Sequence, residues 1–100
     1  MDIDITHQHD DKKGIFIARS KNESIGEMAY HTESTPIMSI NHTEVKDSER
    51  GNDIGIRMLD FAVEYARKNN LTIRPVCKFV NAMFRKYPDK YDDVKVKTQL

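Results

Sequence analysis

Polar and apolar residues alternate through the first half of the chain, a pattern typical of β-strands with one buried face. The alternation runs through four segments, residues 2–7, 15–19, 24–33 and 37–45. Turn-forming residues separate the segments at 10–14, at 20–23 and at Pro36. Because these turns are short, the pattern predicts an antiparallel meander of four strands.

Strict alternation in the fourth segment divides its side chains between two faces. One face is expected to carry Met38, Ile40, His42 and Glu44. The other face is expected to carry Ile37, Ser39, Asn41, Thr43 and Val45.

After residue 52 the apolar spacing changes to that of a helix. One stripe, formed by Ile54, Met58, Ala62, Tyr65 and Ala66, predicts a helix of about four turns. Asn52 or Asp53 is its expected N-cap, and an i, i+4 pair of Glu64 with Lys68 is expected on its surface. The Asn69-Asn70 pair predicts a left-handed stop.

Residues 71–77 predict a short fifth strand, and a second helix follows it. The apolar residues of that helix are Phe79, Val80, Met83, Phe84 and Tyr87. Pro88 is expected to end it, residues 89–93 are expected to form a solvated turn, and residues 95–100 a disordered tail.

The predicted order is therefore four strands, a helix, a strand and a helix. A right-handed crossover through the first helix makes the fourth and fifth strands parallel. The fold class is α+β, an antiparallel four-strand meander followed by a helix, a parallel fifth strand and a last helix. Since one hundred residues are too few for two cores, residues 1–94 are expected to form a single domain.

The charge balance narrows the choice of partners. Sixteen basic and sixteen acidic residues give a formal net charge of zero, which argues against a nucleic-acid binder. No apolar run is long enough to span a membrane, and the polar, acidic start of the chain is unlike a signal peptide. The single cysteine allows no internal disulfide. We expect a cytoplasmic protein, a monomer or a weak dimer.

The junction between the fourth strand and the first helix is the best candidate for a binding site. A helix N-terminus offers unpaired N–H groups and partial positive charge, and Gly51 and Gly55 allow close approach of a bulky anion. Arg50 adds a forked cation. These features fit a phosphate site, and the spacing alone fits an ordinary strand-to-helix turn equally well.

This junction, with Val45, Arg50-Gly51 and Ile54-Gly55, resembles the acyl-coenzyme A motif of the GNAT N-acetyltransferase superfamily. Residues 81–86 (NAMFRK) resemble the helix that closes over the thioester in that superfamily. The resemblance covers residues 14–93 and is stronger for a small subfamily of such domains with a cysteine at the end of the fifth strand.

The resemblance implies acetyl-CoA as cosubstrate and an amine as acceptor. It implies that Thr43 and Val45 flank the pantetheine arm, that Phe84 also faces the arm, and that a main-chain N–H near a bulge in the fourth strand holds the oxyanion. The residues implied to hold the coenzyme diphosphate are Arg50, Gly51, Asn52, Asp53, Ile54 and Gly55.

The chain departs from the superfamily pattern at three points. Asp53 stands where the motif has its first glycine, and Phe84 stands where a tyrosine often protonates the leaving thiolate. The chain also has no helices between its first two strands, which predicts an open acceptor site. These departures leave two alternatives, a coenzyme A-binding module with little turnover and an α+β interaction domain without cofactor.

Five side chains are considered as candidates for chemistry. Cys77, at the end of the fifth strand, is a candidate for accepting acyl or protonating the thiolate, or else is a small buried residue. His42 is a candidate general base, with Glu44 as a second. His7 and His9 share a strand face, but lack a third ligand, so a solvated edge is expected and no metal site.

Overall fold

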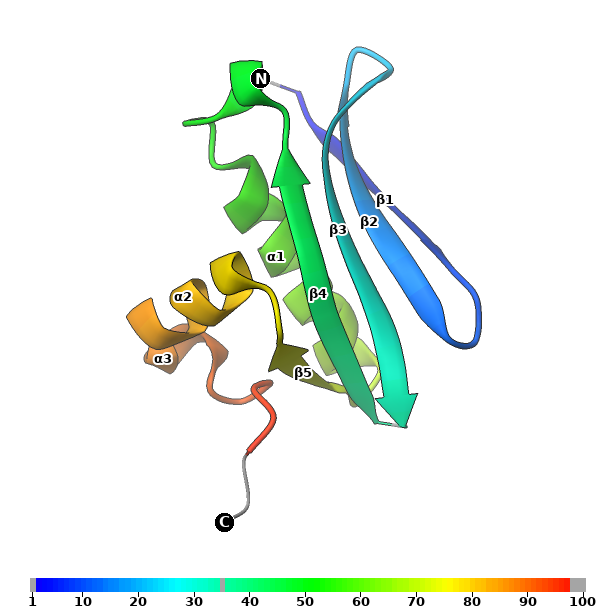
Figure 1. Ribbon diagram of the computed structural model, residues 1–100, viewed down its shortest axis with the longest axis vertical. Helices are drawn as coiled ribbons and strands as arrows, with labels where there is room; N and C mark the ends of the chain where they lie inside the picture. Colours follow the sequence, from blue (N-terminus) through cyan, green and yellow to red (C-terminus); the bar gives the residue numbers. More distant parts are fainter. Residues whose placement is uncertain (1, 35, 98–100) are drawn as a thin grey trace.

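The structure is a computed structural model that describes residues 2–34 and 36–97. Its strands are β1 Asp4–His9, β2 Lys13–Ser20, β3 Glu23–Ser34, β4 Ile37–Val45 and β5 Thr72–Pro75. Its helices are α1 Ile54–Lys68, α2 Lys78–Lys86 and α3 Pro88–Tyr91, with a 3₁₀ turn at Asp47–Glu49. They follow one another as Figure 1 shows, from the β1–β2 hairpin to the helices beside β5.

All five strands form one sheet in the order β1-β2-β3-β4-β5. Neighbouring strands from β1 to β4 pair antiparallel, and β4 pairs with β5 in parallel. This confirms the predicted α+β class, with α1 as the crossover between β4 and β5 (Figure 1). The bounds of β4 are those that the alternation predicted.

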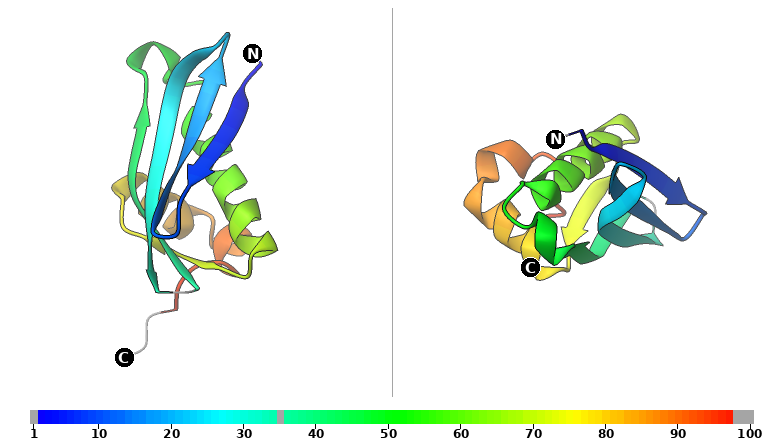
Figure 2. Two further views of the ribbon diagram at one scale, coloured as in Figure 1. Left: turned by 90° about the vertical axis from the view of Figure 1, so that its right-hand side faces the viewer. Right: turned by 90° about the horizontal axis from the view of Figure 1, so that it is seen from above.

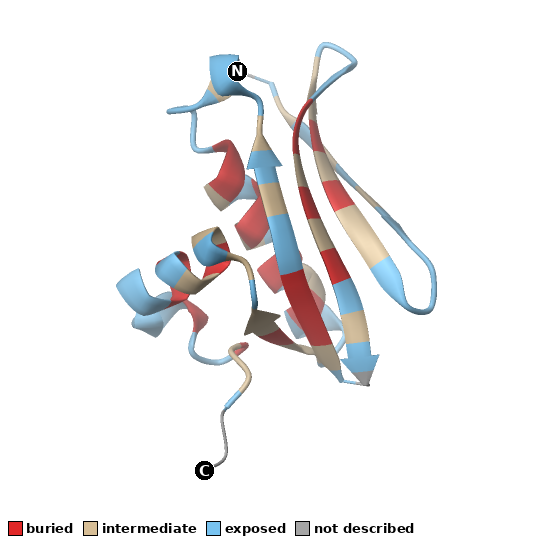
Figure 3. Cartoon of the chain, viewed as in Figure 1, coloured by how far each residue is buried: buried red, intermediate tan, exposed pale blue. Residues whose placement is uncertain are grey.

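The core lies between the sheet and α1, which packs against one face of it (Figure 2). Phe16, Met28 and Ile40 come from the sheet, and Met58 and Ala62 from the predicted stripe of α1; all five are fully buried. The opposite face of the sheet, turned to the viewer in Figure 3, is only partly buried along β3 and β4. Side chains on that face are therefore open to solvent along much of its length.

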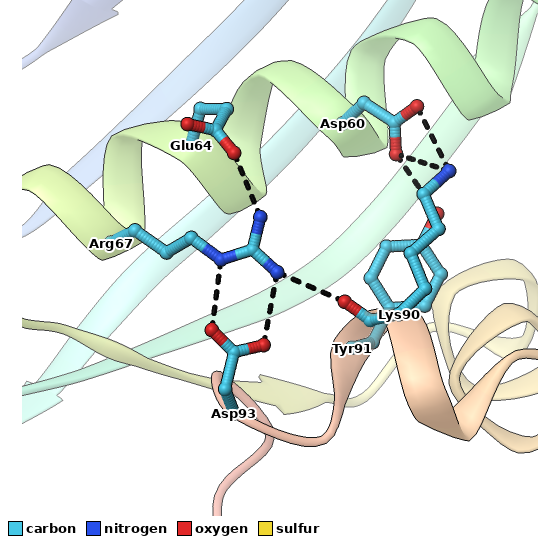
Figure 4. Close-up of polar contacts among 6 residues, drawn as sticks. All are labelled: Asp60, Glu64, Arg67, Lys90, Tyr91 and Asp93. Carbon is cyan, nitrogen blue, oxygen red and sulfur yellow. Dashed lines mark hydrogen bonds and ion pairs between the residues drawn. The ribbon is translucent and has the colours of Figure 1, made fainter.

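The end of α1 follows the prediction in part. Asn70 has a φ of 56°, the left-handed stop that the Asn-Asn pair predicted. Glu64, however, pairs with Arg67 at 2.7 Å, so the predicted pairing with Lys68 is wrong. Arg67 takes this role because Asp93 lies on its other side and fixes the guanidinium (Figure 4).

The chain does not leave the domain at Pro88. Pro88 begins α3 and takes the N-terminal turn, where a missing N–H costs nothing. Residues 89–93 are therefore no solvated turn, since Tyr91 is 1% exposed and its hydroxyl donates to Asp60 at 2.9 Å. Asp93 accepts two bonds of 2.9 Å from Arg67, and this lowers the pKa of its carboxyl.

The first two residues of the segment expected to be a tail lie against β5. Lys95 forms a parallel bridge with Ile73, and the Val96 N–H donates to the Ile73 carbonyl at 2.9 Å. Residues 98–100 lie outside the described residues. Of the helices that the structure describes, none has the length and apolar character that crossing a membrane requires.

His7 is half-buried, so the expectation that it lies on a solvated edge is wrong. Its ring stacks on Phe16 at 4.2 Å between centroids, and Nε2 lies 2.7 Å from the Tyr30 hydroxyl. Partial burial, together with the neighbouring His9, lowers the pKa of His7. The sequence signal was available, because His7 continues the alternation of Ile3 and Ile5, which pack against the core.

The lowered pKa of His7 predicts that the protein loses stability at pH values well above those at which carboxylates titrate. Below 6.5, the ordinary pKa of a histidine side chain, the unfolded chain takes up a proton at this position that the native state resists. Stability should therefore fall as the pH drops through and below that value. Urea unfolding at pH 7.5 and pH 5.5, about one unit either side of that pKa, checks this expectation. The free energy of unfolding should change less between the two pH values in His7→Gln than in the wild type. Equal changes in the two proteins would contradict this account.

Candidate functional site

Strands β4 and β5 separate after a short parallel stretch. Their register ends with Ile40 opposite Pro75, which has no N–H to extend the ladder. The next two N–H groups, of Val76 and Cys77, both donate to the Ile40 carbonyl, at 3.1 and 2.9 Å. From residue 41 to 45, β4 is therefore paired with β3 alone among the described strands, and its other backbone edge is open.

A bulge in β4 coincides with the start of this open edge. Ala29 pairs with His42 and Tyr30 with Ile40, so Asn41 is an extra residue on β4. One extra residue reverses the alternation beyond it. The prediction that His42 shares a face with Met38 and Ile40 is therefore wrong: Ile40 is buried, whereas His42 is exposed and contacts Glu27 on the open face of the sheet.

Thr43 and Val45 consequently turn toward α1. Val45 packs against the core cluster, and both residues line a cleft at the N-terminal end of that helix. The cleft has a volume of about 390 Å³. Its other lining residues come from the end of β4, the following loop, the first turn of α1 and the start of α2: Glu44, Glu49, Arg50, Gly51, Asp53, Ile54, Gly55, Ile56 and Phe79.

The loop between β4 and α1 contains two left-handed residues. Gly51 has a φ of 93°, and a Cβ built on it meets nothing within 4 Å, so glycine here serves the backbone conformation. Asp53 precedes α1 with a φ of 59°, and its side chain makes no capping bond. Asp53 thus occupies the predicted N-cap position without the predicted capping, because a left-handed residue does not have the extended conformation of a usual N-cap.

The first N–H groups of α1 are available to a ligand. The first helical bond runs from the Arg57 N–H to the Asp53 carbonyl at 3.0 Å. The N–H groups of Ile54, Gly55 and Ile56 precede that bond and have no acceptor one helical turn earlier. All three residues line the cleft, so the positive end of the helix dipole lies beside it.

Packing requires a glycine at position 55, which could not be predicted from the sequence. A Cβ built on Gly55 would lie 2.8 Å from the Phe79 ring, and Gly55 is buried. Phe79, predicted as a core residue of the second helix, is only partly buried and forms one wall of the cleft. Gly55 therefore lets the first turns of α1 and α2 meet, and the cleft lies beside that contact.

Cys77 stands beside the cleft, immediately before α2. Its Sγ lies 3.2 Å from the Oγ1 of Thr43, which lines the cleft. Cys77 is half-buried and packs against the core cluster, so its thiol is partly accessible. The contact joins the open edge of β4 to the end of β5 where the two strands part.

Besides Cys77, three other predicted site residues lie outside the lining of the cleft. Phe84 is 1% exposed and stacks on Tyr91 at 5.1 Å, so the predicted contact with the pantetheine arm is not supported by its position. The Asn52 side chain donates to Glu49 at 3.1 Å, in the loop. His42 lies across the strand from Thr43, on the open face of the sheet.

The charges around the cleft are mainly acidic. Glu44, Glu49 and Asp53 line it, whereas Arg50 is the one basic side chain in its wall. The Arg50 side chain already forms an ion pair with Asp47, at 3.2 Å, and is 74% exposed. An anionic ligand here would depend on backbone N–H groups more than on side-chain charge.

Comparison with known proteins finds a matching family and similar folds. The profile of a family described as GCN5-related N-acetyl-transferase matches residues 15–94. A GCN5-like protein from Staphylococcus aureus, solved by NMR, is 32% identical over 96% of this chain and 90% of its own, with a TM-score of 0.72. No curated protein matches the sequence.

Two longer proteins share the fold at lower identity. One, described as a predicted acetyltransferase from Clostridium acetobutylicum and solved with acetyl-CoA, is 24% identical with a TM-score of 0.62, over 88% of this chain and 64% of its own. A GNAT family acetyltransferase from Elizabethkingia anophelis with acetyl-CoA bound is 17% identical with a TM-score of 0.62, over 76% of this chain and 53% of its own.

Proposed function

The chain belongs to the GCN5-related N-acetyl-transferase family, and from this premise we propose that it binds acetyl-CoA in the cleft and transfers the acetyl group to an amine. The observation that carries the proposal is the open edge of β4 at residues 41–45, which leads directly into the cleft at the start of α1. Such an edge can pair with an extended ligand through main-chain hydrogen bonds. The two fold relatives solved with acetyl-CoA support the same ligand.

In this proposal different parts of the cleft bind different parts of the coenzyme. The pantetheine arm pairs with the β4 edge between Thr43 and Val45, and the diphosphate lies at the N–H groups of residues 54–56. Arg50 and Gly51 form the outer rim. The glycine at 51 keeps side-chain atoms out of the approach to these donors.

The reaction requires a free amine at the open face of β4. The amine nitrogen attacks the thioester carbon, the new C–N bond forms, and the C–S bond breaks. The nitrogen gives up one proton, and the coenzyme thiolate takes up one. In this proposal a main-chain N–H at the Asn41 bulge stabilises the oxyanion, and Cys77 is our candidate proton donor, since Phe84 has no hydroxyl. Generating the free amine by His42 or Glu44 stays a prediction from the sequence.

Amide chemical shifts test the proposal directly. Titration of labelled protein with acetyl-CoA should move the resonances of residues 43–45 and 51–56, and leave those of the β1–β2 turn in place. A panel of amines added with acetyl-CoA should then release free coenzyme thiol. Absent shifts at millimolar ligand would refute binding, whereas shifts without thiol release would favour the coenzyme-binding module.

A second candidate function rests on the Thr43–Cys77 contact. The Cys77 Sγ lies 3.2 Å from a side chain of the cleft wall, and in this second candidate function it accepts the acetyl group as a thioester, with free coenzyme A as the leaving group. We expect intact-mass spectra after incubation with acetyl-CoA to show the gain of one acetyl group, and Cys77→Ser to abolish it. Thr43→Val, which removes only the hydroxyl, is the matched variant. An unmodified wild-type chain would exclude covalent transfer and leave Cys77 the proton-donor role.

Neutralising Asp53 is expected to tighten acetyl-CoA binding. Its carboxylate lines the cleft beside the proposed diphosphate position and caps nothing. Removing one like charge is worth about 1 kcal/mol, or about fivefold in affinity, at low ionic strength. Asp53→Asn keeps a side chain that tolerates the left-handed backbone, so stability should not change.

Calorimetric titration of Asp53→Asn checks this expectation. Asp11→Asn is the control for net charge, because Asp11 is exposed in the β1–β2 turn, away from the cleft (Figure 1). Equal affinities in Asp53→Asn, Asp11→Asn and wild type would show that the carboxylate points away from the bound diphosphate.

A further inference from the structure

Three potential metal-binding side chains meet on the open face of the sheet. Glu27 extends from β3, and His42 and Glu44 extend from β4. The His42 Nε2 lies 3.4 Å from the Glu27 Oε1 and 3.4 Å from the Glu44 Oε2. One ligand atom from each residue lies within 4.8 Å of the other two.

The register of the sheet holds these side chains together. Glu27 is directly opposite Glu44, and Ala29 is opposite His42, so His42 lies diagonally across from Glu27. The bulge at Asn41 is what turns His42 to this face. The cluster is therefore fixed by two paired strands rather than by a loop.

The two glutamates lie opposite each other without a lysine or arginine to balance their charges. Like charges directly opposite each other in a sheet are destabilising. Other acidic residues on the same chain pair with a lysine or arginine, for example Glu23 with Lys46 and Glu33 with Arg74. Within residues 2–34 and 36–97, the ion pairs of Glu27 and Glu44 involve only His42.

We propose that Glu27, His42 and Glu44 form a binding site for a divalent first-row transition-metal cation such as Zn²⁺. Bonds of about 2.0–2.1 Å at a tetrahedral angle place two ligand atoms roughly 3.4 Å apart. The two N···O distances in the cluster have this value. An imidazole with two carboxylates suits such metals, and the fourth position is open to water because all three residues are solvent-accessible.

This site can be tested separately from the proposed acetyl transfer. Its ligand atoms lie on the opposite side of β4 from Thr43 and Val45, and Glu44 is the one residue that both belongs to the cluster and lines the cleft. Metal binding would occupy the Nε2 lone pair of His42, so a metal ligand and a general base at His42 are mutually exclusive states. Zinc binding can be measured without coenzyme or acceptor, so its failure would leave the transfer proposal standing.

Calorimetric titration with Zn²⁺ tests the site. The full chain carrying Cys77→Ser is used after treatment with a chelator, so that the lone thiol adds no ligand. We expect one site with micromolar affinity, and a loss of affinity of roughly tenfold or more in Glu27→Gln and in His42→Gln, since losing even an outer-shell partner of a metal ligand costs about 10–100-fold. Mg²⁺ should not compete, because it prefers oxygen ligands and keeps its waters.

Two other histidines provide matched controls. His31 is exposed on β3 and bonded to Asn41 at 2.8 Å, and His9 is exposed on β1. His31→Gln and His9→Gln should bind Zn²⁺ as the parent does. No binding by the parent, or unchanged affinity in Glu27→Gln and His42→Gln, would overturn the proposal, as would loss of binding in His9→Gln alone.

Discussion

Replacing Gly51 by glutamate is expected to weaken acetyl-CoA binding about a hundredfold. Space is available for the side chain, since a Cβ at this position meets nothing within 4 Å, and Gly51 lines the cleft. A carboxylate about 5 Å from the diphosphate, at an effective dielectric of about 40, opposes each phosphate charge by about 1.7 kcal/mol. Two such charges give roughly 3 kcal/mol, in a wall that already carries Glu44, Glu49 and Asp53.

Gly51→Gln is the matched control for this variant. Glutamine has the same size as glutamate and the same conflict with the φ of 93°, so both variants should lose the same stability, about 1–2 kcal/mol. Calorimetric titration at low salt should find that Gly51→Gln binds acetyl-CoA within a few fold of wild type. Similar affinities for the two variants would mean that the diphosphate lies elsewhere, and the location of the cofactor in this cleft would be wrong.

The sheet and the long helix could be predicted from the sequence because each produces a local periodic pattern of apolar residues. The bounds of β4 and the buried stripe through Met58 and Ala62 follow from side-chain alternation and helical spacing alone. The loop at Gly51 was identified for a similar reason, since glycine marks backbone that other residues avoid. Local patterns were sufficient wherever one element determined the outcome.

The side-chain directions beyond Ile40 could not be predicted in this way. They depend on the bulge at Asn41, which arises from how β3 and β4 pair across 12 residues of sequence (Ala29 to Asn41). Without it, His42 is assigned to the wrong face and its contacts with Glu27 and Glu44 disappear. The wall formed by Phe79 against Gly55 is equally non-local, since it joins two helices.

The region after α2 was mispredicted because its stabilising partners are distant in sequence. Pro88 ends one helix and begins the next. Two of the four charged residues at 89–93 form ion pairs with side chains of α1. Lys90 pairs with Asp60 at 3.1 Å, and Asp93 with Arg67 at 2.9 Å (Figure 4). A run of charged residues looks solvated when the opposite charges lie on another helix.

Replacing Tyr91 by alanine is therefore expected to be severely destabilising, by about 3–5 kcal/mol. The side chain is 1% exposed and its ring stacks on Phe84 at 5.1 Å. It joins α3 to both α2 and α1, because its hydroxyl donates to Asp60 at 2.9 Å (Figure 4). Domains of this kind have a total stability of about 5–15 kcal/mol, so urea unfolding of Tyr91→Ala should begin at much lower denaturant than in wild type.

Tyr91→Phe separates the ring from the hydroxyl. It keeps the stacking on Phe84 and removes one hydrogen bond, so it should cost only about 1 kcal/mol, and Asp60 retains Lys90 as a partner. A midpoint for Tyr91→Ala close to that of Tyr91→Phe would mean that α3 is not docked in solution. Because α2 carries Phe79 into the cleft wall, Tyr91→Ala should also weaken acetyl-CoA binding below its unfolding transition, and Tyr91→Phe should not.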